Sequence, residues 1–349
     1  MTEGPHMTED LHIRTEGRAG RITLTRPKAL NALSHPMALA LEAAIDLWRD
    51  DPAVDLLILD AEGERAFCAG GDIAEVYRAG KAGDDAAGRD FWRDEYRMNA
   101  KLAEYPKPII ALMQGFVMGG GVGIGCHVSH RVVGETTLMA MPECGIGLIP
   151  DVGGTLLLAR APGRLGRYLG LTGARMGAGD AIHAGFADHY LPEADWPALI
   201  ADLCTTGDAG LVAARALPAP ASPLAEAAVG IDAAFSDTDI AQIVHNLEPH
   251  PAPWATEARK AILRNSPLSM GCTLNLLDML TPADGIRQAL SHEFRFTFRA
   301  VAHTDFLEGV RAQIIDKDRS PRWRHALGTV TAEERQALLA PLGPDDLSF

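Results

Sequence analysis

Two acidic residues stand in an otherwise apolar stretch of the chain, residues 139–154 (MAMPECGIGLIPDVGG). Glu143 follows a strand-like run and a proline, and Asp151 precedes two glycines and a helical pattern. The seven residues between them form a loop that can bring both carboxyl groups into one cavity. Two acids held together in apolar walls titrate at different pH values, which prepares one as an acid and one as a base. The structural alternatives are a helix N-cap for Asp151 and a buried ion pair for Glu143.

Glycines gather at two places where a strand-like run ends and a helix is expected to begin. The first is residues 69–72 (AGGD), and the second is residues 118–121 (MGGG). The N-terminus of a helix offers unpaired N–H groups, and glycine lets a ligand oxygen approach the backbone closely. Two such N–H groups that converge would form an oxyanion hole. For each loop alone, a tight turn or close helix packing is the alternative explanation.

Other catalytic and cofactor motifs do not occur in the sequence. The glycines between residues 119 and 123 do not fit a dinucleotide fingerprint, and no phosphate-binding loop, G-x-S-x-G elbow or H-E-x-x-H motif is present. His127 and His130 lie close together, but no third metal ligand can be identified, so core or surface histidines are the preferred interpretation. We therefore expect no metal and no redox cofactor.

The five cysteines are odd in number and never have C-x-x-C spacing, which favours reduced, buried thiols. A nucleophilic Cys144 beside Glu143 is the alternative. No neighbouring base or cation would generate its thiolate, so we prefer the structural interpretation.

The 349 residues, 47% of them hydrophobic, suffice for one large domain or two ordinary ones. A net charge of −14 disfavours nucleic acid and anionic membrane surfaces as partners. An anionic small molecule would need a local basic patch or backbone N–H donors. The sequence has no apolar run long enough to span a bilayer, and its first ten residues lack the features of a signal peptide. A cytoplasmic location is the resulting expectation.

Short β-branched runs alternate with helical patterns up to about residue 190, which predicts α/β organisation. Strands are expected at residues 21–25, 56–60, 109–113 and 131–134. Helices are expected at residues 36–48, 89–103, 254–264, 268–280, 283–315 and 332–339. We therefore divide the chain into an α/β core over residues 11–190 and a helical region over residues 191–349, with residues 217–224 as a connection.

Three motifs, in this order, resemble the enoyl-CoA hydratase/isomerase, or crotonase, superfamily. They are residues 26–33 (RPKALNAL), 66–73 (AFCAGGDI) and 107–121 (KPIIALMQGFVMGGG). The resemblance implies a spiral of repeated ββα units with a helical C-terminal layer that covers the site or joins subunits of a homo-oligomer. It also implies that the N–H groups of Gly71 and Gly120 hold the carbonyl oxygen of an acyl-coenzyme A thioester. Coenzyme A is then part of the substrate. The resemblance implies that its adenine and pantetheine groups lie along Lys28, Leu30, Ala69, Asp72 and Ile73.

Hydratases of this superfamily have one glutamate just after the triple glycine and another after the proline that Pro142 matches. Here the first position is Gly123, the second is Glu143, and Asp151 stands where hydratases usually have glycine. In this exchange of residues, the sequence resembles the branch of the superfamily that hydrolyses 3-hydroxyisobutyryl-CoA in valine breakdown. Further matches to that branch are residues 91–96, 266–270 and 308–323. In the branch, the positions that contact substrate are Glu95, Gly120, Glu143 and Asp151, whereas residues 210–256 remain unassigned.

The expected reaction is hydrolysis of a hydroxyacyl-CoA thioester. Glu143 would either attack the carbonyl to form an anhydride or remove a proton from water, and Asp151 would orient the acyl hydroxyl or the water. The sequence leaves 3-hydroxyisobutyryl-CoA and 3-hydroxypropionyl-CoA open as substrates. The alternatives are an enoyl-CoA hydratase or isomerase and a non-catalytic acyl-CoA-binding protein.

Overall fold

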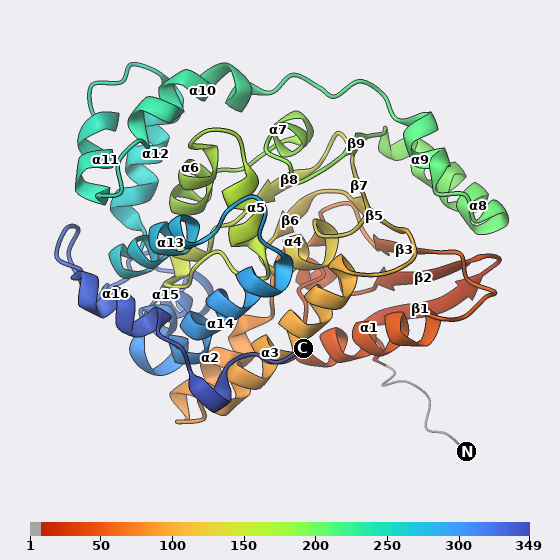
Figure 1. Cartoon of the computed structure of the whole chain (residues 1–349), viewed down its shortest axis with the longest axis horizontal. Helices are drawn as coiled ribbons and strands as arrows, with labels where there is room; N and C mark the ends of the chain where they lie inside the picture. Colours follow the sequence, from red (N-terminus) through yellow and green to blue (C-terminus); the bar gives the residue numbers. More distant parts are fainter. Residues whose placement is uncertain (1–7) are drawn as a thin grey trace. The chain divides into compact units, whose positions relative to one another are not determined.

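The computed structural model describes residues 8–349 (Figure 1). Two compact units make up the chain. The sheet unit comprises the residues up to Gly71 together with Asp94–Met139 and Met176–Ser222. The helical unit comprises Asp72–Arg93, Ala140–Arg175 and Pro223–Phe349. Because both units are discontinuous in sequence, the division near residue 190 stays a prediction.

The sheet unit is built on a six-stranded sheet. Its order is β1 (Leu11–Glu16), β2 (Ala19–Leu24), β3 (Leu56–Ala61), β5 (Ile109–Met113), β7 (His130–Val133) and β9 (His189–Tyr190). The first two strands form an antiparallel hairpin, and every following pair is parallel. Nearly all residues of β3 and β5 are buried, which matches the apolar runs at residues 56–59 and 109–113. The four strands expected from the sequence are confirmed to within about two residues.

Helices supply the rest of the core of this unit. Helix α1 (His35–Trp48) begins at Ser34, whose side chain accepts a hydrogen bond from the backbone N of Met37. Its last residue, Trp48, packs against β2 at Gly20, where a Cβ would lie 2.5 Å from the indole ring. Helices α8 (Trp196–Thr206) and α9 (Gly210–Arg215) bury apolar side chains against β2, β3, β5 and β7. Helix α7 (Ala178–His183) precedes β9.

A second sheet has the order β4 (Ala66–Cys68), β6 (Phe116–Met118) and β8 (Leu138–Ala140). Strands β4 and β6 are parallel. The carboxyl ends of parallel strands lie at one edge of a sheet, and each of these two strands runs directly into a glycine loop. This pairing therefore brings the two glycine loops to the same edge.

The helical unit contains α2 (Ile73–Lys81), the start of α3 (Ala86–Ala103), and most of the C-terminal helices. The other helices are α5 (Gly154–Arg160), α6 (Leu165–Thr172), α10 (Pro223–Ala234), α11 (Ile240–Leu247), α12 (Pro253–Arg264), α13 (Pro267–Met279), α14 (Ile286–His303), α15 (Phe306–Val310) and α16 (Ala332–Leu339). Helix α13 is buried on nearly all sides, and it contacts α5, α6 and α16.

The expectation of a single helix over residues 283–315 is wrong, because α14 ends at His303. Thr304 has an extended backbone, and Asp305 is 1% exposed. The Asp305 carboxylate accepts hydrogen bonds from the Ser266 hydroxyl (2.6 Å) and from the backbone N of Arg324 (3.0 Å). These partners are distant in sequence, so periodicity alone could not reveal the break. A π-helical turn, Arg311–Ile315, follows α15.

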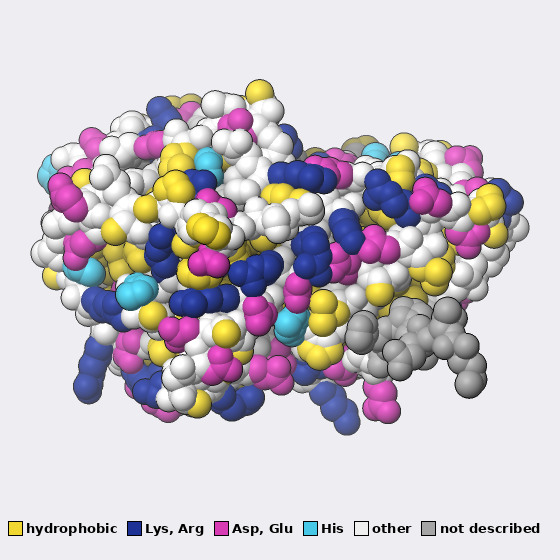
Figure 2. Space-filling view, turned by 60° about the horizontal axis from the view of Figure 1, so that its bottom comes forward, with side chains coloured by type: hydrophobic (Ala, Val, Ile, Leu, Met, Phe, Trp, Pro, Cys, Tyr) yellow, Lys and Arg dark blue, Asp and Glu magenta, His cyan; other side chains and the backbone are white. Residues whose placement is uncertain are grey.

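Charged side chains of both signs share the surface. On the face shown in Figure 2, Lys and Arg side chains lie beside Asp and Glu side chains. The ion pair Arg311–Glu308 (2.8 Å) joins two partly exposed side chains, whereas Arg97 pairs with the buried Glu42 (2.7 Å). Within residues 8–349, no helix is both long and apolar enough to cross a membrane.

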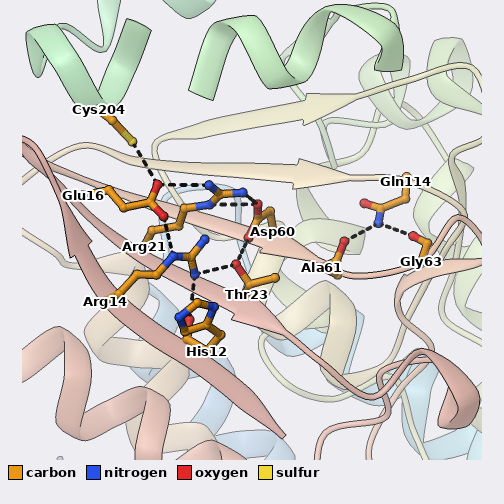
Figure 3. Close-up of polar contacts among 10 residues, drawn as sticks. All are labelled: His12, Arg14, Glu16, Arg21, Thr23, Asp60, Ala61, Gly63, Gln114 and Cys204. Carbon is orange, nitrogen blue, oxygen red and sulfur yellow. Dashed lines mark hydrogen bonds and ion pairs between the residues drawn. The ribbon is translucent and has the colours of Figure 1, made fainter. Parts of the chain in front are cut away.

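Polar contacts fix the first strands and the turn that leads to β4 (Figure 3). Arg21 on β2 pairs with Asp60 on β3 (2.6 Å) and with Glu16 on β1 (3.1 Å). Gln114, which follows β5 and is 8% exposed, donates hydrogen bonds to the carbonyl oxygens of Ala61 (2.9 Å) and Gly63 (2.8 Å). One side-chain amide therefore holds the turn between β3 and β4, upstream of the first glycine loop.

Replacing Gln114 by Met keeps the side-chain volume but removes both donors. We expect the free energy of unfolding, measured in urea, to fall by about 1–2 kcal/mol because two carbonyl groups lose their partner. The matched change Gln242→Met on the exposed face of α11 should alter it by less than about 0.5 kcal/mol. Equal effects at the two positions would show that Gln114 does not hold the turn.

Candidate active site

The two glycine loops meet within the sheet unit. Gly71 follows β4, and Gly120 is the first residue of α4 (Gly120–Gly125). A Cβ added to Gly120 would lie 3.3 Å from the backbone N of Gly71. The first N–H groups of a helix have no acceptor within that helix, so this position suits a bound oxygen. The two backbone positions are adjacent, as an oxyanion hole requires, and their role as donors stays a prediction.

The three consecutive glycines of the second loop have different structural reasons. Gly119 has a φ of 47°, which disfavours a side chain. A Cβ on Gly121 would lie 2.1 Å from the carbonyl oxygen of Cys68, so this residue permits close packing of α4 on β4. A Cβ on Gly120 would lie 2.8 Å from Oε1 of Glu95 and 3.3 Å from the backbone N of Gly71, so a side chain is disfavoured here too. Close packing therefore explains both Gly120 and Gly121.

Glu95 belongs to the same cluster. It lies on α3, is 2% exposed, and its Oε1 would be 2.8 Å from a Cβ on Gly120. Burial raises the pKa of the neighbouring Cys68 thiol to about 12, and the negative charge of Glu95 adds to this increase. A carboxyl group is thus present beside the two glycine backbones, where the sequence placed a substrate contact.

The residues expected along coenzyme A are partly brought together. The backbone N of Ala69 donates to the carbonyl oxygen of Leu30 (3.1 Å), and Lys28 is exposed in the short 3-10 helix Pro27–Ala29. Leu30 and Ala69 are partly exposed, as a ligand path requires. Asp72, the N-cap residue of α2, and Ile73, its first residue, belong to the helical unit. Their contact with coenzyme A stays a prediction.

Sequence analysis missed Asn31, which holds this loop in place. Its side chain is fully buried, and its amide donates to the carbonyl oxygens of Ala66 (2.9 Å) and Glu62 (3.0 Å). It also accepts a hydrogen bond from the backbone N of Arg26 (2.9 Å). The signal was present in the sequence as the polar residue between Leu30 and Ala32.

Glu143 opens the 3-10 helix Glu143–Ile146 in the helical unit and is 4% exposed. Its Oε2 has no hydrogen-bond partner, and no cation pairs with it, among residues 8–349. Burial raises the pKa of Glu143 well above its usual value of 4.5, and the charge of Asp151 raises it further. The buried ion pair considered for Glu143 is therefore wrong.

Asp151 lies on the turn that precedes α5 and is 4% exposed. The N-cap of α5 is Gly153, so the expected structural alternative, Asp151 as helix cap, is also wrong. The charge of Asp151 contributes to the raised pKa of Glu143, so the two carboxyl groups interact electrostatically. The helical unit therefore holds two buried acids, Glu143 and Asp151, that interact electrostatically.

A third buried acid, Glu293 on α14, was not found from the sequence. It is fully buried, and burial raises its pKa from 4.5 to about 8, with the charge of Asp151 adding to the increase. Its carboxyl group accepts hydrogen bonds from the backbone N of Gly153 (2.7 Å) and of Thr155 (3.0 Å). The available signal was one acid on the apolar stripe that contains Leu290 and Thr297.

Cys144, next to Glu143, is not a nucleophile. Burial raises the pKa of its thiol to about 12, and its Sγ lies 3.4 Å from the Thr273 hydroxyl. All five cysteines are free and buried, as expected. The thiolate needed for nucleophilic chemistry is therefore disfavoured at neutral pH.

The raised pKa of Glu293 predicts a pH dependence of stability. The folded chain holds this proton more tightly than the unfolded chain does, so the contribution is complete below about pH 4.5 and is lost as the pH rises to about 8. Removing the titration with Glu293→Gln should flatten the decrease of unfolding free energy over this interval. Urea unfolding at several pH values tests this. An unchanged slope would contradict the shift, and Glu226→Gln on the exposed face of α10 is the control.

Comparison with known proteins gives the family. The enoyl-CoA hydratase/isomerase family model matches residues 19–339. A relative from Gallus gallus named 3-hydroxyisobutyryl-CoA hydrolase, mitochondrial, is 39% identical over 97% of this chain and 91% of its own length. The relative of the same name from Homo sapiens is 36% identical over 100% of this chain and 93% of its own length.

Two solved structures share nearly the whole fold. An enoyl-CoA hydratase from Rhodobacter sphaeroides 2.4.1 has a TM-score of 0.93 and 58% identity, covering 98% of this chain and 100% of that one. A carnitinyl-CoA dehydratase from Mycobacterium thermoresistibile has a TM-score of 0.93 and 42% identity, covering 98% and 99%. These matches confirm the expected α/β class with a helical C-terminal layer.

The expectation of a cytoplasmic location is wrong on this comparison, because the names of the relatives place them in the mitochondrion. The family match covers both units, including the glycine loops, the acid pair and the C-terminal helices. This chain belongs to the enoyl-CoA hydratase/isomerase family.

Proposed function

We propose that this chain hydrolyses a short hydroxyacyl-CoA thioester, and that its substrate is 3-hydroxyisobutyryl-CoA, which yields 3-hydroxyisobutyrate and coenzyme A. The observation that supports the proposal is the pair of buried acids, Glu143 and Asp151, in which the charge of Asp151 contributes to the raised pKa of Glu143. The names of the relatives support the same substrate and reaction.

Gly123 argues against hydration as the principal reaction. The resemblance to hydratases implies a glutamate at this position, but here a buried glycine lies within α4. The acid that is gained, Asp151, lies in the electrostatic field of the acid that is kept, Glu143. In hydratases of the family, a pair of glutamates adds water to a double bond. We infer that the Glu143/Asp151 pair of this chain instead directs water to a thioester.

In the proposed mechanism, the N–H groups of Gly71 and Gly120 bind the thioester oxygen as it becomes negative. Each such donor is typically worth about 10² to 10³ in rate. Glu95, next to Gly120, would hydrogen-bond the acyl end of the substrate. No metal or redox cofactor is needed in this scheme, because a thiolate is a good leaving group.

Glu143 supplies the base or the nucleophile. As a base it removes a proton from water while the water oxygen attacks the carbonyl carbon; the C–S bond then breaks, and the proton passes to the departing thiolate. As a nucleophile it attacks the same carbon, releases the thiolate, and forms an anhydride that water then opens. A pKa raised toward neutrality makes the ionised form a stronger base. Asp151 would orient the water or the acyl hydroxyl in both schemes.

The similarity to an enoyl-CoA hydratase of known structure supports a second candidate, hydration of an enoyl-CoA. The two reactions are separated by incubating the protein with 3-hydroxyisobutyryl-CoA, 3-hydroxypropionyl-CoA and crotonyl-CoA. Release of free thiol from the hydroxyacyl esters supports hydrolysis. Loss of the crotonyl double bond without thiol supports hydration, and tight binding without turnover supports a binding protein.

Glu143→Gln is expected to lower the rate of thiol release by about 10² to 10⁴, because the amide can neither accept a proton nor attack. Binding to the coenzyme A part of the substrate should be largely retained. Calorimetry with free coenzyme A measures it. The exposed Glu226→Gln change is the control and should leave both quantities unchanged. Turnover by Glu143→Gln at the rate of the unsubstituted protein would refute the assignment.

A further inference from the structure

The turn that carries Asp151 has an unfavourable backbone. Val152 has a φ of 53° and Gly153 a φ of 79°, so two consecutive residues are left-handed. For a β-branched residue such as valine, this conformation is strained and persists only where the surroundings hold it. A backbone change at Val152 would redirect the neighbouring Asp151 side chain.

Helix α5 cannot hold this turn by itself. Its N-cap is Gly153, which has no side chain, so the usual hydrogen bond from a cap to the first N–H groups is not made locally. The backbone N of Gly154 donates to the carbonyl oxygen of Asp151 (2.6 Å), which closes the turn. The other N–H groups at the start of the helix need acceptors from elsewhere in the chain.

Glu293 takes the place of the missing cap from 140 residues away. Its Oε2 accepts from the backbone N of Gly153 (2.7 Å), and its Oε1 accepts from the backbone N (3.0 Å) and the hydroxyl of Thr155. Both carboxyl oxygens are therefore used on the residues that follow Val152. Glu293 itself is 0% exposed on α14, which packs against α5.

A cap alone does not require an acid in this place. A neutral hydroxyl or amide oxygen can accept hydrogen bonds from the first N–H groups of a helix without the cost of burying a carboxyl group. The charge of Asp151 raises the pKa of Glu293, and the charge of Glu293 contributes to the raised pKa of Glu143. A structural role alone therefore does not explain why a third acid, Glu293, lies within electrostatic reach of the two acids that are proposed to react.

We propose that Glu293 is a positioning residue for the reaction: by capping α5, its carboxyl group holds the left-handed turn at Val152 and so keeps Asp151 in place beside Glu143. This inference rests on the proposed function of the acid pair. It predicts a defect in the chemical step, with substrate binding less affected, when the contact is lost.

The test compares kcat and KM for thiol release from 3-hydroxyisobutyryl-CoA. Glu293→Gln, which places an NH₂ group against one of the backbone donors, should lower kcat by about 10-fold to 100-fold, as a misplaced reactive group does, while KM changes less than threefold. Val152→Gly in the same chain removes the strain of the turn, and should restore kcat at least threefold. The same glycine change in the unsubstituted protein should not raise kcat.

A purely structural Glu293 gives a different result: the melting temperature falls, but kcat per folded molecule stays within twofold of the unsubstituted value. That result, or the failure of Val152→Gly to restore kcat, overturns the inference. Should Glu293→Gln not fold, Thr155→Val replaces it, since this change removes only the hydroxyl donor and keeps the side-chain shape; it should lower kcat at least threefold, and an unchanged kcat overturns the inference. Glu226→Gln is the control for added amides.

The unsubstituted protein separates this inference from the proposed function. If it releases no thiol from any hydroxyacyl-CoA but hydrates crotonyl-CoA, the proposed hydrolysis fails. The same variants are then compared in hydration, where an unchanged kcat for Glu293→Gln overturns the positioning role independently.

Discussion

The carboxyl group of Glu293 and the N-terminus of α5 form the contact on which the arrangement of the acids in the helical unit depends. Its two oxygens accept three hydrogen bonds from Gly153 and Thr155, and these replace the cap that α5 does not have. The turn before them is left-handed at Val152, which local interactions alone would not favour. Without this long-range contact, the backbone just after Asp151 would lose the hydrogen bonds that hold it against α14.

In the sheet unit, a different principle positions the two glycine loops. Parallel pairing of β4 and β6 brings two glycine loops to one sheet edge, and close packing of Gly121 on Cys68 fixes their separation. Side chains then hold the approach: Gln114 fixes the turn before β4, and Asn31 ties the neighbouring loop to β4. Backbone donors placed in this way need no rearrangement when charge develops on a bound oxygen, which is why such donors are effective.

Local patterns in the sequence predicted what local interactions determine. The apolar run of β5 and the periodic pattern of α16 were predicted to the residue, and α1 to within one residue, whereas β4, β6 and β8 have three residues each and give no periodic signal. The break after α14 and the role of Glu293 depend on partners far away in the chain, so they could not be predicted. Glu143 and Asp151 were found because acids stand out in an apolar stretch. Their structural alternatives could be rejected only once the N-cap of α5 and the surroundings of Glu143 were known.

The central claim is that Glu143 and Asp151 act as one interacting pair. The pH dependence of kcat/KM for thiol release tests it most directly, because its acidic limb reports the pKa of the base in the free enzyme. Asp151→Asn removes a negative charge that raises the pKa of Glu143, with Glu293 and its contacts left in place. The account predicts that the acidic limb moves to lower pH in this variant. A limb that stays in place, or moves to higher pH, would contradict it.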